Sequence, residues 1–512
     1  MDEARPDSAL PSPAIRLAIT VVVMSASLMQ VLDSTIANVA LPHMQATLGA
    51  TQDSIAWVLT SYIVAAAIAT PVTGWLEGRF GRRELFLAAI VGFTLSSMAC
   101  GLAPSLAAMV AARLAQGVFG AFISPLSQAV MLDIYPPGKR PLAMTIWGMG
   151  VMIGPILGPV LGGWLTDNLN WRWVFFINVP IGLIVSVGGW ALLRSAPRSA
   201  RPFDAAGFAM LALALASFQL VLDRGTQLDW LDSTEILIEI GIAAAAFWMF
   251  IVHCVTARHP LIPPALFRDR NLMIANLFLL VSSGIMMAGA ALIAPMLQRM
   301  MGYGVVDAGA LVMPRGISMM LSMILAGRLV GLVDSRILIA TGLALSAVSQ
   351  FMMTGFDLQM GSGPIIMSGL VQGLGMGLVI LPLNLLAFAT LAPQNVTEGA
   401  ALYSLFRNLG GSIAISITTA LVARNTQVSH SDLSAHVTTV TMPFMTAGLV
   451  EQLGLRAEDL MRLVDAEVNR QALMIAYLDD FWLMAWAAAV ITPLALLMRP
   501  ARQGEKPVLM SE

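Results

Sequence analysis

Residues 147–163 read WGMGVMIGPILGPVLGG, an apolar stretch in which glycine recurs at every fourth position. Four glycines fall on one stripe of a helix and two prolines lie beside them: Gly150, Gly154, Gly158, Gly162, Pro155 and Pro159. In water each interior glycine costs about 0.5–1 kcal/mol and each proline about 3 kcal/mol, whereas neighbouring helices in a membrane satisfy the freed backbone groups. Small residues four apart also let two helices approach backbone to backbone. The stretch predicts a membrane helix with a tightly packed face, which serves either as a static contact or as a hinge.

The composition of the whole chain also indicates a membrane protein. Apolar residues make up 57% of the 512 residues and charged residues 11%, against roughly 45–50% and 25% in soluble domains. A hydrocarbon core needs about 20 apolar residues per helix. Fourteen stretches come close to that length: 16–41, 54–76, 84–103, 106–131, 142–165, 173–193, 204–222, 234–256, 271–297, 307–330, 336–355, 362–390, 398–421 and 478–498. We therefore predict an all-α membrane protein with 14 transmembrane helices.

The placement of arginine and lysine tests this number of helices, because cytoplasmic loops carry an excess of both. With the N-terminus inside, most of the 28 basic residues fall in cytoplasmic segments, and an odd number of helices would scramble that asymmetry. Both termini are therefore predicted to be cytoplasmic. A signal peptide after Arg16 is the alternative for the first stretch, but no small-residue cleavage site precedes Pro42.

Several function classes lack their motifs in this sequence. A phosphate-binding P-loop needs Lys followed by Ser or Thr, whereas Lys139 and Lys506 precede Arg and Pro, and neither HExxH nor GxSxG occurs. Cys100 and Cys254 lie in predicted helices and form neither a disulfide framework nor a metal pair. The basic clusters are topological signals and indicate no nucleic-acid partner. We expect no enzyme activity, metal or cofactor, and a proton gradient as the energy source.

An internal repeat links the two ends of the chain. LAQG at 114–117 recurs as LVQG at 370–373, and Pro-Leu at 125–126 recurs at 382–383. Repeated halves around a midplane cavity are a general transporter design. Eight predicted helices separate the equivalents where two six-helix halves need six, so two helices are inserted. The expected units are a first half at 1–193, a basic linker with helices seven and eight at 194–257, a second half at 258–498 including an outer loop at 424–477, and a cytoplasmic tail at 499–512.

Several strings together resemble one family. LDSTIANVALP at 32–42, GWLEGRFGRR at 74–83, RLAQGVFGA at 113–121, WRWVFFINVPIG at 171–182 and LDRG at 222–225 resemble motifs of the fourteen-helix drug:proton antiporter family of the major facilitator superfamily. The chain looks most like the EmrB-type inner-membrane subunits of tripartite efflux pumps. The glycine stripe is similar to the motif on the fifth helix of such antiporters, where it is thought to govern sealing between the halves.

The resemblance implies a major facilitator fold of two six-helix halves plus two inserted central helices. It also implies a cytoplasmic loop motif after the second helix, made of Gly74, Arg79, Gly81 and Arg82. The sequence departs from the family pattern at Gly78, where the family usually carries Asp. Glu77 stands one place earlier, so a charge relay through this loop is open to question.

Ionisable residues within a bilayer usually face a cavity or a partner. Asp33 in the first predicted helix and Arg113 in the fourth each lie about eight residues from the outer end, roughly 12 Å deep at 1.5 Å per residue. Equal depth makes a pair possible. Burial favours a protonated Asp33 whereas a nearby Arg favours an ionised one, so a change in their separation could load and unload a proton. A static ion pair that holds the helices together is the alternative.

A second group of polar residues provides candidates for a substrate cavity: Asn38, Gln116, Gln128, Gln372, Asn384 and Arg407. Each amide could instead tie helices together, and Arg315 or Arg407 could bond exposed carbonyls near a helix end or the Pro314 kink. His253 is expected to pack rather than to carry protons. Methionine is abundant, at 34 residues, and suits either a polyspecific apolar pocket or lipid-facing filler.

The expected outer loop from Arg424 to Tyr477 contains an amphipathic stretch at 457–476 with apolar residues at helical spacing. In the EmrB-like interpretation it contacts a periplasmic adaptor protein leading to an outer-membrane channel, and the alternative is packing on the membrane surface. The resemblance thus implies a proton-coupled multidrug efflux antiporter of the bacterial inner membrane for hydrophobic or amphiphilic compounds. An exporter of an endogenous lipid or metabolite, and a membrane enzyme or scaffold without flux, are the other hypotheses.

Overall fold

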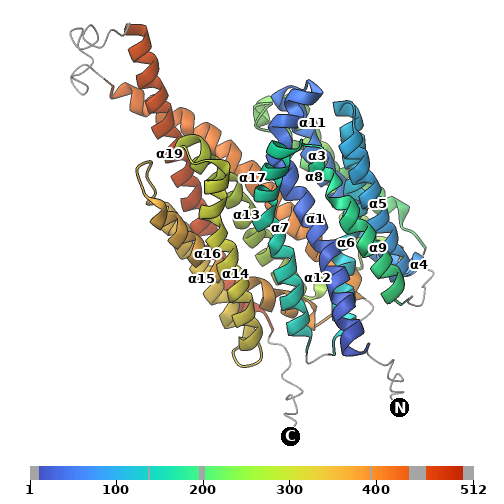
Figure 1. The fold of residues 1–512 in the computed structure, drawn as a ribbon. Helices are drawn as coiled ribbons and strands as arrows, with labels where there is room; N and C mark the ends of the chain where they lie inside the picture. Colours follow the sequence, from blue (N-terminus) through green and yellow to red (C-terminus); the bar gives the residue numbers. More distant parts are fainter. Residues whose placement is uncertain (1–10, 137–138, 195–201, 392–394, 438–456, 500–512) are drawn as a thin grey trace, which may run out of the picture.

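The computed structural model describes residues 11–136, 139–194, 202–391, 395–437 and 457–499, and these form a bundle of long helices (Figure 1). The first half of the bundle contains α1 (Pro13–Leu48), α2 (Gln52–Ile55), α3 (Trp57–Ala69), η1 (Thr70–Val72), α4 (Thr73–Phe80), α5 (Arg82–Leu102), α6 (Leu106–Ile134), α7 (Arg140–Asn168), α8 (Trp173–Phe176) and α9 (Asn178–Leu192). Two further helices, α10 (Ala205–Arg224) and α11 (Thr234–Thr256), follow, with the short turn η3 (Trp230–Asp232) between them. The second half contains α12 (Pro264–Arg268), α13 (Arg270–Pro295), η4 (Met296–Met300), α14 (Val305–Leu329), α15 (Ser335–Met353), α16 (Ser362–Ala389), α17 (Val396–Ala435), α19 (Ala457–Ile491) and η7 (Thr492–Leu497).

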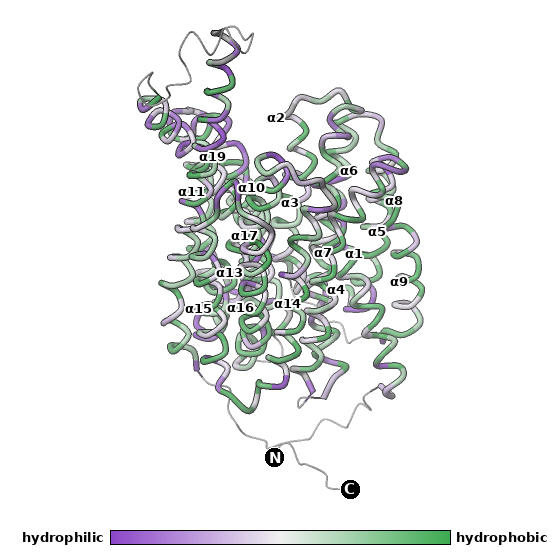
Figure 2. Tube along the Cα trace, turned by 60° about the vertical axis from the view of Figure 1, so that its left-hand side comes forward, coloured by the Kyte–Doolittle hydropathy of each residue, from purple (hydrophilic) through white to green (hydrophobic). Residues whose placement is uncertain are grey.

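These helices match the predicted spans closely. Over the described residues, 13 helices are long and apolar enough to cross a membrane, and α7 adds a shorter apolar stretch at Leu142–Gly154 within its 29 residues. Local signals explain their ends: the Ser12 side chain caps the start of α1, and Gly49 ends it in the left-handed conformation with φ 62°. The tube is mostly hydrophobic along the bundle and more hydrophilic toward its ends (Figure 2).

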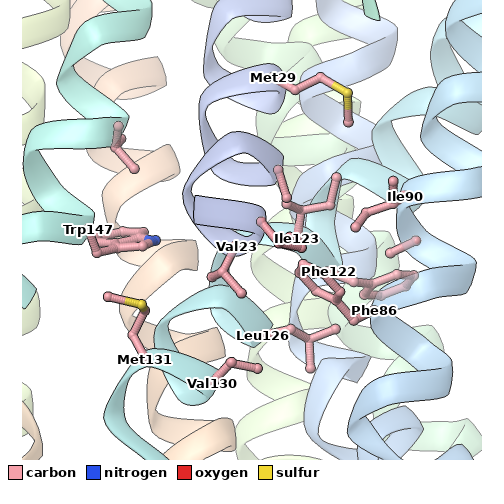
Figure 3. Close-up of a cluster of buried hydrophobic side chains, with 14 of the residues drawn as sticks. Val23, Met29, Phe86, Ile90, Phe122, Ile123, Leu126, Val130, Met131 and Trp147 are labelled. Carbon is pink, nitrogen blue, oxygen red and sulfur yellow. The ribbon is translucent and has the colours of Figure 1, made fainter. Parts of the chain in front are cut away.

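Buried apolar clusters fill both halves and continue across the interface between them. In the first half, Val23 of α1, Phe86 of α5, Phe122 of α6 and Trp147 of α7 belong to one buried cluster (Figure 3). The halves meet where α7 packs on α14 and where α17 packs on α6, η1 and α4. The predicted inserted helices, α10 and α11, pack on each other, and α10 also contacts α3 and α17.

The outer segment differs from the loop expected at 424–477. Helix α17 continues to Ala435 and α19 begins at Ala457, so much of the segment prolongs two membrane helices beyond the bundle (Figure 1). His430 of α17 lies 3.0 Å from Asp465 of α19. The amphipathic stretch is therefore the first part of α19 rather than a separate surface helix, because the prolonged α17 offers it a packing partner. Residues 438–456 of the expected loop lie outside the described part of the chain.

Candidate functional site

A buried carboxylate lies at the meeting point of three helices of the first half. The Asp33 side chain on α1 has no exposed surface. Arg113 Nη1 of α6 lies 2.7 Å from its Oδ2, while Gln116 Nε2 of α6 and Asn178 Nδ2 of α9 each lie 2.8 Å from its Oδ1. The structure thus brings together the two charges that the sequence places at equal depth, and adds two amide donors to the acid.

The guanidinium of this pair has partners of its own. Arg113 is 1% exposed, its Nε donates to the Val58 carbonyl at 3.0 Å, and its Nη1 also donates to Gln116 Oε1 at 2.8 Å. The ring centroids of Tyr62 and Phe175 lie 4.4 Å and 5.8 Å from the guanidinium carbon. Carbonyl groups and aromatic faces stabilise a cation away from water. The arginine therefore keeps part of its stabilisation when the carboxylate is neutralised.

A further layer of hydrogen bonds orients the donors. Asn178 Nδ2 also lies 3.0 Å from Ser97 Oγ on α5, and Ser97 donates to the Phe175 carbonyl at 2.9 Å. Sequence reasoning did not single out Asn178, although it lies in the family-like string at 171–182. The available signal was an amide at the start of an otherwise apolar helix. Removing either Asp33 or Arg113 from the buried ion pair would cost about 3–5 kcal/mol, because it leaves an uncompensated charge.

The glycine stripe of α7 packs against the helix that carries Asp33. A Cβ added at Gly154 would lie 2.8 Å from Val31 Cγ1, and one added at Gly158 would lie 2.1 Å from Thr35 Oγ1. Thr35 Oγ1 also lies 3.3 Å from the Gly154 carbonyl oxygen, across the interface. The close backbone approach predicted from the stripe is therefore present, and its partner is α1. The side chains of Pro155 and Pro159 lie outside the described residues.

The outer members of the stripe follow the same interface. Gly150 faces Met24 and Gly162 faces Ile36, with added Cβ atoms at 2.5 Å and 3.2 Å from the nearest side-chain atoms. All four glycines therefore line one contact along α1, which is tightest at Gly154 and Gly158, where an added Cβ would meet the β-branched Val31 and Thr35.

A cavity of about 60 Å³ lies between the two halves. Trp147 and Met152 of α7 line it on one side, and Met286, Met323, Met376, Asn384, Tyr403 and Arg407 line it on the other. The methionines make its walls apolar and deformable. Among the described residues, no partner is found for the Tyr403 hydroxyl or for Asn384 Oδ1. The cavity thus combines soft apolar walls with a few polar groups.

Two hydrogen bonds connect this cavity to the helices of the ion pair. Trp147 Nε1 donates to Ser27 Oγ of α1 at 3.1 Å, and Arg407 Nη2 donates to Ser124 Oγ of α6 at 3.2 Å. The second bond also crosses from one half to the other. Rearrangement of α1 or α6 around Asp33 would therefore act directly on the cavity wall.

The remaining cavity candidates lie elsewhere. Gln116 bonds the ion pair rather than lining the cavity, because it shares α6 with Arg113 at a spacing of one turn. Asn38 is exposed and donates to the Ser34 carbonyl at 3.1 Å, a contact within its own helix. Gln128 and Gln372 are buried, and neither amide has a hydrogen-bond partner among the described residues.

Two other polar residues have structural partners. Arg315 donates to the Met286 carbonyl at 3.3 Å, in line with the carbonyl-binding alternative. His253 Nε2 lies 2.7 Å from Asp204 Oδ1 at the ends of α11 and α10. Over the residues that the structure describes, no group of three or more His, Cys, Asp or Glu residues could hold a metal ion.

The cytoplasmic loop motif forms a compact charged turn. Gly81 connects α4 to α5 with φ 96°, a conformation that favours glycine. Arg82 Nε lies 2.6 Å from Glu77 Oε1, and Arg82 also pairs with Asp133 at the end of α6. Glu77 thus provides the loop with an acid partner although Gly78 stands at the family's usual Asp position.

The other two members of the motif lie on α4, outside this turn. Arg79 is exposed. A Cβ added at Gly74 would lie 2.8 Å from Glu398 Cγ, so α4 approaches the start of α17 in the other half closely at this point.

Two helical halves that meet at a cavity, with a buried ion pair in one of them, define the architecture of a membrane transporter. The family model described as Major Facilitator Superfamily matches residues 23–415. The multidrug export protein EmrB of Escherichia coli K12 is 34% identical over 485 residues, which cover 94% of this chain and 95% of that protein. EmrB of Haemophilus influenzae is 34% identical over 473 residues, covering 91% and 92%. The chain therefore belongs to the major facilitator superfamily, and within it to the family of the EmrB proteins.

One further sequence relative and one solved structure also match this chain. The fatty acid resistance protein FarB of Neisseria gonorrhoeae is 33% identical over 476 residues, covering 92% of this chain and 94% of that protein. The solved structure of XylE, a proton:xylose symporter, superposes with a TM-score of 0.62 over 94% of this chain and 96% of its own, at 14% identity. This last likeness concerns the fold alone. The all-α major facilitator fold predicted from the sequence is confirmed.

Proposed function

We propose that this protein is a multidrug efflux transporter of the bacterial inner membrane that exports hydrophobic or amphiphilic compounds in exchange for protons, with both termini in the cytoplasm. Its relatives named for multidrug export support the efflux activity. The observation that carries proton coupling is the fully buried Asp33 on α1, which three side-chain donors of α6 and α9 hold. A buried acid of this kind is a functional group by default within a membrane.

The mechanism follows from the partners of the acid. When Asp33 is ionised, Arg113, Gln116 and Asn178 converge on it and draw α1, α6 and α9 together. A proton on the carboxyl removes the charge–charge attraction, while Arg113 keeps its carbonyl and aromatic contacts. The cost of separating α1 from α6 then falls, since a neutral pair holds less strongly than a charged one.

The glycine stripe transmits such a movement to the cavity. Because α7 lies directly on α1 and carries Trp147 into the cavity wall, a shift of α1 changes the position of that wall. Protonation from the outer side would favour the state that has released the compound, and deprotonation toward the cytoplasm would favour the state that binds the next one. Binding of the substrate and binding of the proton would then oppose each other, because both depend on the positions of α1, α6 and α9.

A flux measurement tests this proposal. The full chain is reconstituted into lipid vesicles with a pH gradient, and movement of a fluorescent amphiphilic compound is recorded together with proton movement. We expect uphill movement of the compound with protons moving in the opposite direction, in the wild type and in the Asp334→Asn control. Asp334 pairs with Arg336 at the surface, outside the presumed pathway.

The outcomes separate the alternatives. Proton-coupled movement of a lipid or metabolite without movement of drug-like compounds would favour the endogenous exporter. No coupled flux of any compound would contradict the antiporter and favour a membrane enzyme or scaffold.

We also propose that the outer ends of α17 and α19, which we call the outer arms (residues 424–435 and 457–467), dock a periplasmic adaptor leading to an outer-membrane channel. The arms project beyond the bundle (Figure 1), and Val428, Met461 and Leu463 are 52%, 60% and 59% exposed. Exposed apolar side chains on an ordered projection favour a protein partner. Packing against the membrane surface is the alternative.

Replacing residues 428–467, which lie outside the buried part of α19, by a Gly/Ser linker tests the docking proposal. We expect coupled flux in vesicles to remain largely intact, because the presumed site lies between the membrane helices, and resistance in cells to be lost together with co-purification of the adaptor. Retained co-purification would refute the docking role. Lost flux in vesicles would make the arms part of the transport cycle instead.

A further inference from the structure

A second buried acid lies in the second half, away from the ion pair. The Asp480 side chain on α19 is 0% exposed, and neither of its carboxyl oxygens has a hydrogen-bond partner among the residues that the structure describes. Tyr477, Phe481 and Met484 on the same helix belong to the apolar cluster around it. The acid thus lacks the donors that hold Asp33.

The internal repeat relates the position of Asp480 to the polar network around Asp33 in the first half. In the first half, the third, fourth and sixth long helices (α5, α6 and α9) contribute Ser97, Gln116 and Asn178 to the polar network. In the second half, the corresponding helices α15, α16 and α19 carry three buried polar residues at similar levels: Gln350, Gln372 and Asp480. Gln372 is the repeat partner of Gln116. The second half therefore carries an acid near the level at which the first half carries an amide.

The two networks differ in how far they are satisfied. Gln350 Nε2 makes only a long contact, 3.8 Å, to Met484 Sδ one turn beyond Asp480, and its Oε1 is unpartnered among the described residues. Both polar atoms of Gln372 are likewise unpartnered there. Orphaned buried polar groups are rare in native proteins and call for an explanation.

The charged surroundings of Asp480 provide no counter-ion. On its own helix, Asp479 is an exposed acid that accepts from Asn425 Nδ2 of α17 at 3.0 Å, and Tyr477 is the other titratable neighbour. Arg299 of η4 interacts electrostatically with the Tyr477 hydroxyl, but it forms no ion pair with Asp480 among the described contacts.

The remaining charges on the packed helices lie farther away along the chain. Arg424 and His430 of α17 belong to its outer part, where His430 pairs with Asp465. Arg407 of the same helix bonds Ser124 of the other half. On α15 and α13 the basic residues are Arg336 and Arg270, at the opposite ends of those helices. A carboxylate without a partner is far too costly in an apolar interior, and such a group takes up a proton instead.

We propose that Asp480 is a second proton-binding site, located in the second half. In the conformation described here the carboxyl carries its proton, since burial without donors leaves no place for the anion. The proton leaves to water when α19 separates from α15 and α17, and the carboxylate takes one up again when the helices close. That this exchange serves transport rests on the proposed function, whereas the binding of a proton does not.

Infrared spectroscopy of the purified full chain in lipid tests the site without any transport. At pH 6 we expect a C=O band of a protonated carboxyl in the wild type, its loss in Asp480→Asn, and its retention in the matched control Asp479→Asn. The amide is nearly isosteric with the neutral acid, so the fold should persist. No band in the wild type, or an unchanged band in Asp480→Asn, would overturn the proposal.

A second measurement needs no variant. Dicyclohexylcarbodiimide adds to neutral carboxyls in apolar surroundings: the carboxyl O–H adds across a C=N bond, and the adduct rearranges to a stable N-acylurea without any oxidation. Peptide mass analysis of the treated wild type should locate the adduct on Asp480 in most molecules and leave Asp479 unmodified. Absence of modification at Asp480 would contradict the site. Failure of flux with a retained band and adduct would instead count against the proposed function alone.

Discussion

Replacing Gly158 tests whether the contact between α7 and α1 is part of the transport cycle. A Cβ at this position would lie 2.1 Å from Thr35 Oγ1 and 2.7 Å from Thr35 Cβ. The distance to Oγ1 is 1.3 Å shorter than the 3.4 Å at which ordinary van der Waals contact begins. Overpacking of this kind costs about 1–3 kcal/mol. If the alternate state separates these helices, the populations of the two states shift by about 5- to 150-fold.

The expected result for Gly158→Ala is normal insertion with transport reduced within that range, and Gly158→Leu should lower it further. The control is Gly241→Ala on α11, where an added Cβ meets nothing within 4 Å. Initial rates in vesicles are divided by the amount of folded protein, and melting temperatures in detergent are recorded in parallel. A Gly158→Leu variant with wild-type rate and wild-type amount would refute the reasoning, because it would show that the stripe carries no close contact in the cycle.

Two further predictions concern the cavity and the cytoplasmic end. Arg407→Gln should raise the KM for anionic compounds by about tenfold or more, with little change for neutral ones, because a hydrogen bond to a charged group is worth about 1.5–3 kcal/mol; equal KM values for both kinds of compound would count against a cavity role. At the start of α10, burial raises the pKa of Asp204, but hydrogen bonds from the Gly207 and Leu261 amides and from His253 outweigh it and hold the pKa below its usual value. Its stabilisation is therefore complete above the ordinary pKa of the carboxyl and disappears as pH falls through the lowered pKa. Asp204→Asn should reduce the melting temperature at pH 7, and this reduction should shrink as pH falls below the ordinary carboxyl pKa. A reduction of equal size at every pH would contradict the prediction.

The sequence predicted the membrane helices well because their signals are local. Runs of apolar residues mark the helices where they stand. The ends were less exact, since α1 runs from Pro13 to Leu48 where the apolar run predicts 16–41. The outer segment was the main miss. Its polar composition indicated a loop, whereas α17 and α19 support each other as helices beyond the bundle, through contacts such as that of His430 with Asp465.

The site was predictable only in part. Depth along a helix placed Asp33 and Arg113 at the same level, and that estimate depends on helix rise alone. Which face each amide presents depends on how the helices rotate against one another. For that reason the sequence did not separate Gln116, which bonds the ion pair, from Asn384, which lines the cavity.

Two further residues, Asn178 and Asp480, could not be assigned a role from the sequence for the same reason. Asn178 and Asp480 each stand as isolated polar residues within apolar helices. Only the packing of α9 on α1 and of α19 on α15 shows that one reaches Asp33 and that the other has no described donor.

The most direct test of proton coupling is uphill transport by Asp33→Asn in vesicles under a pH gradient. The amide can neither bind nor release a proton, and its loss of charge leaves Arg113 uncompensated at a cost of about 3–5 kcal/mol, so Asp33→Asn combined with Arg113→Gln serves as the folding control. The account predicts that Asp33→Asn still binds the compound and equilibrates it down its concentration gradient, but does not accumulate it against that gradient. Accumulation at the wild-type level, driven by the same pH gradient, would contradict the account and show that Asp33 is not the coupling carboxylate.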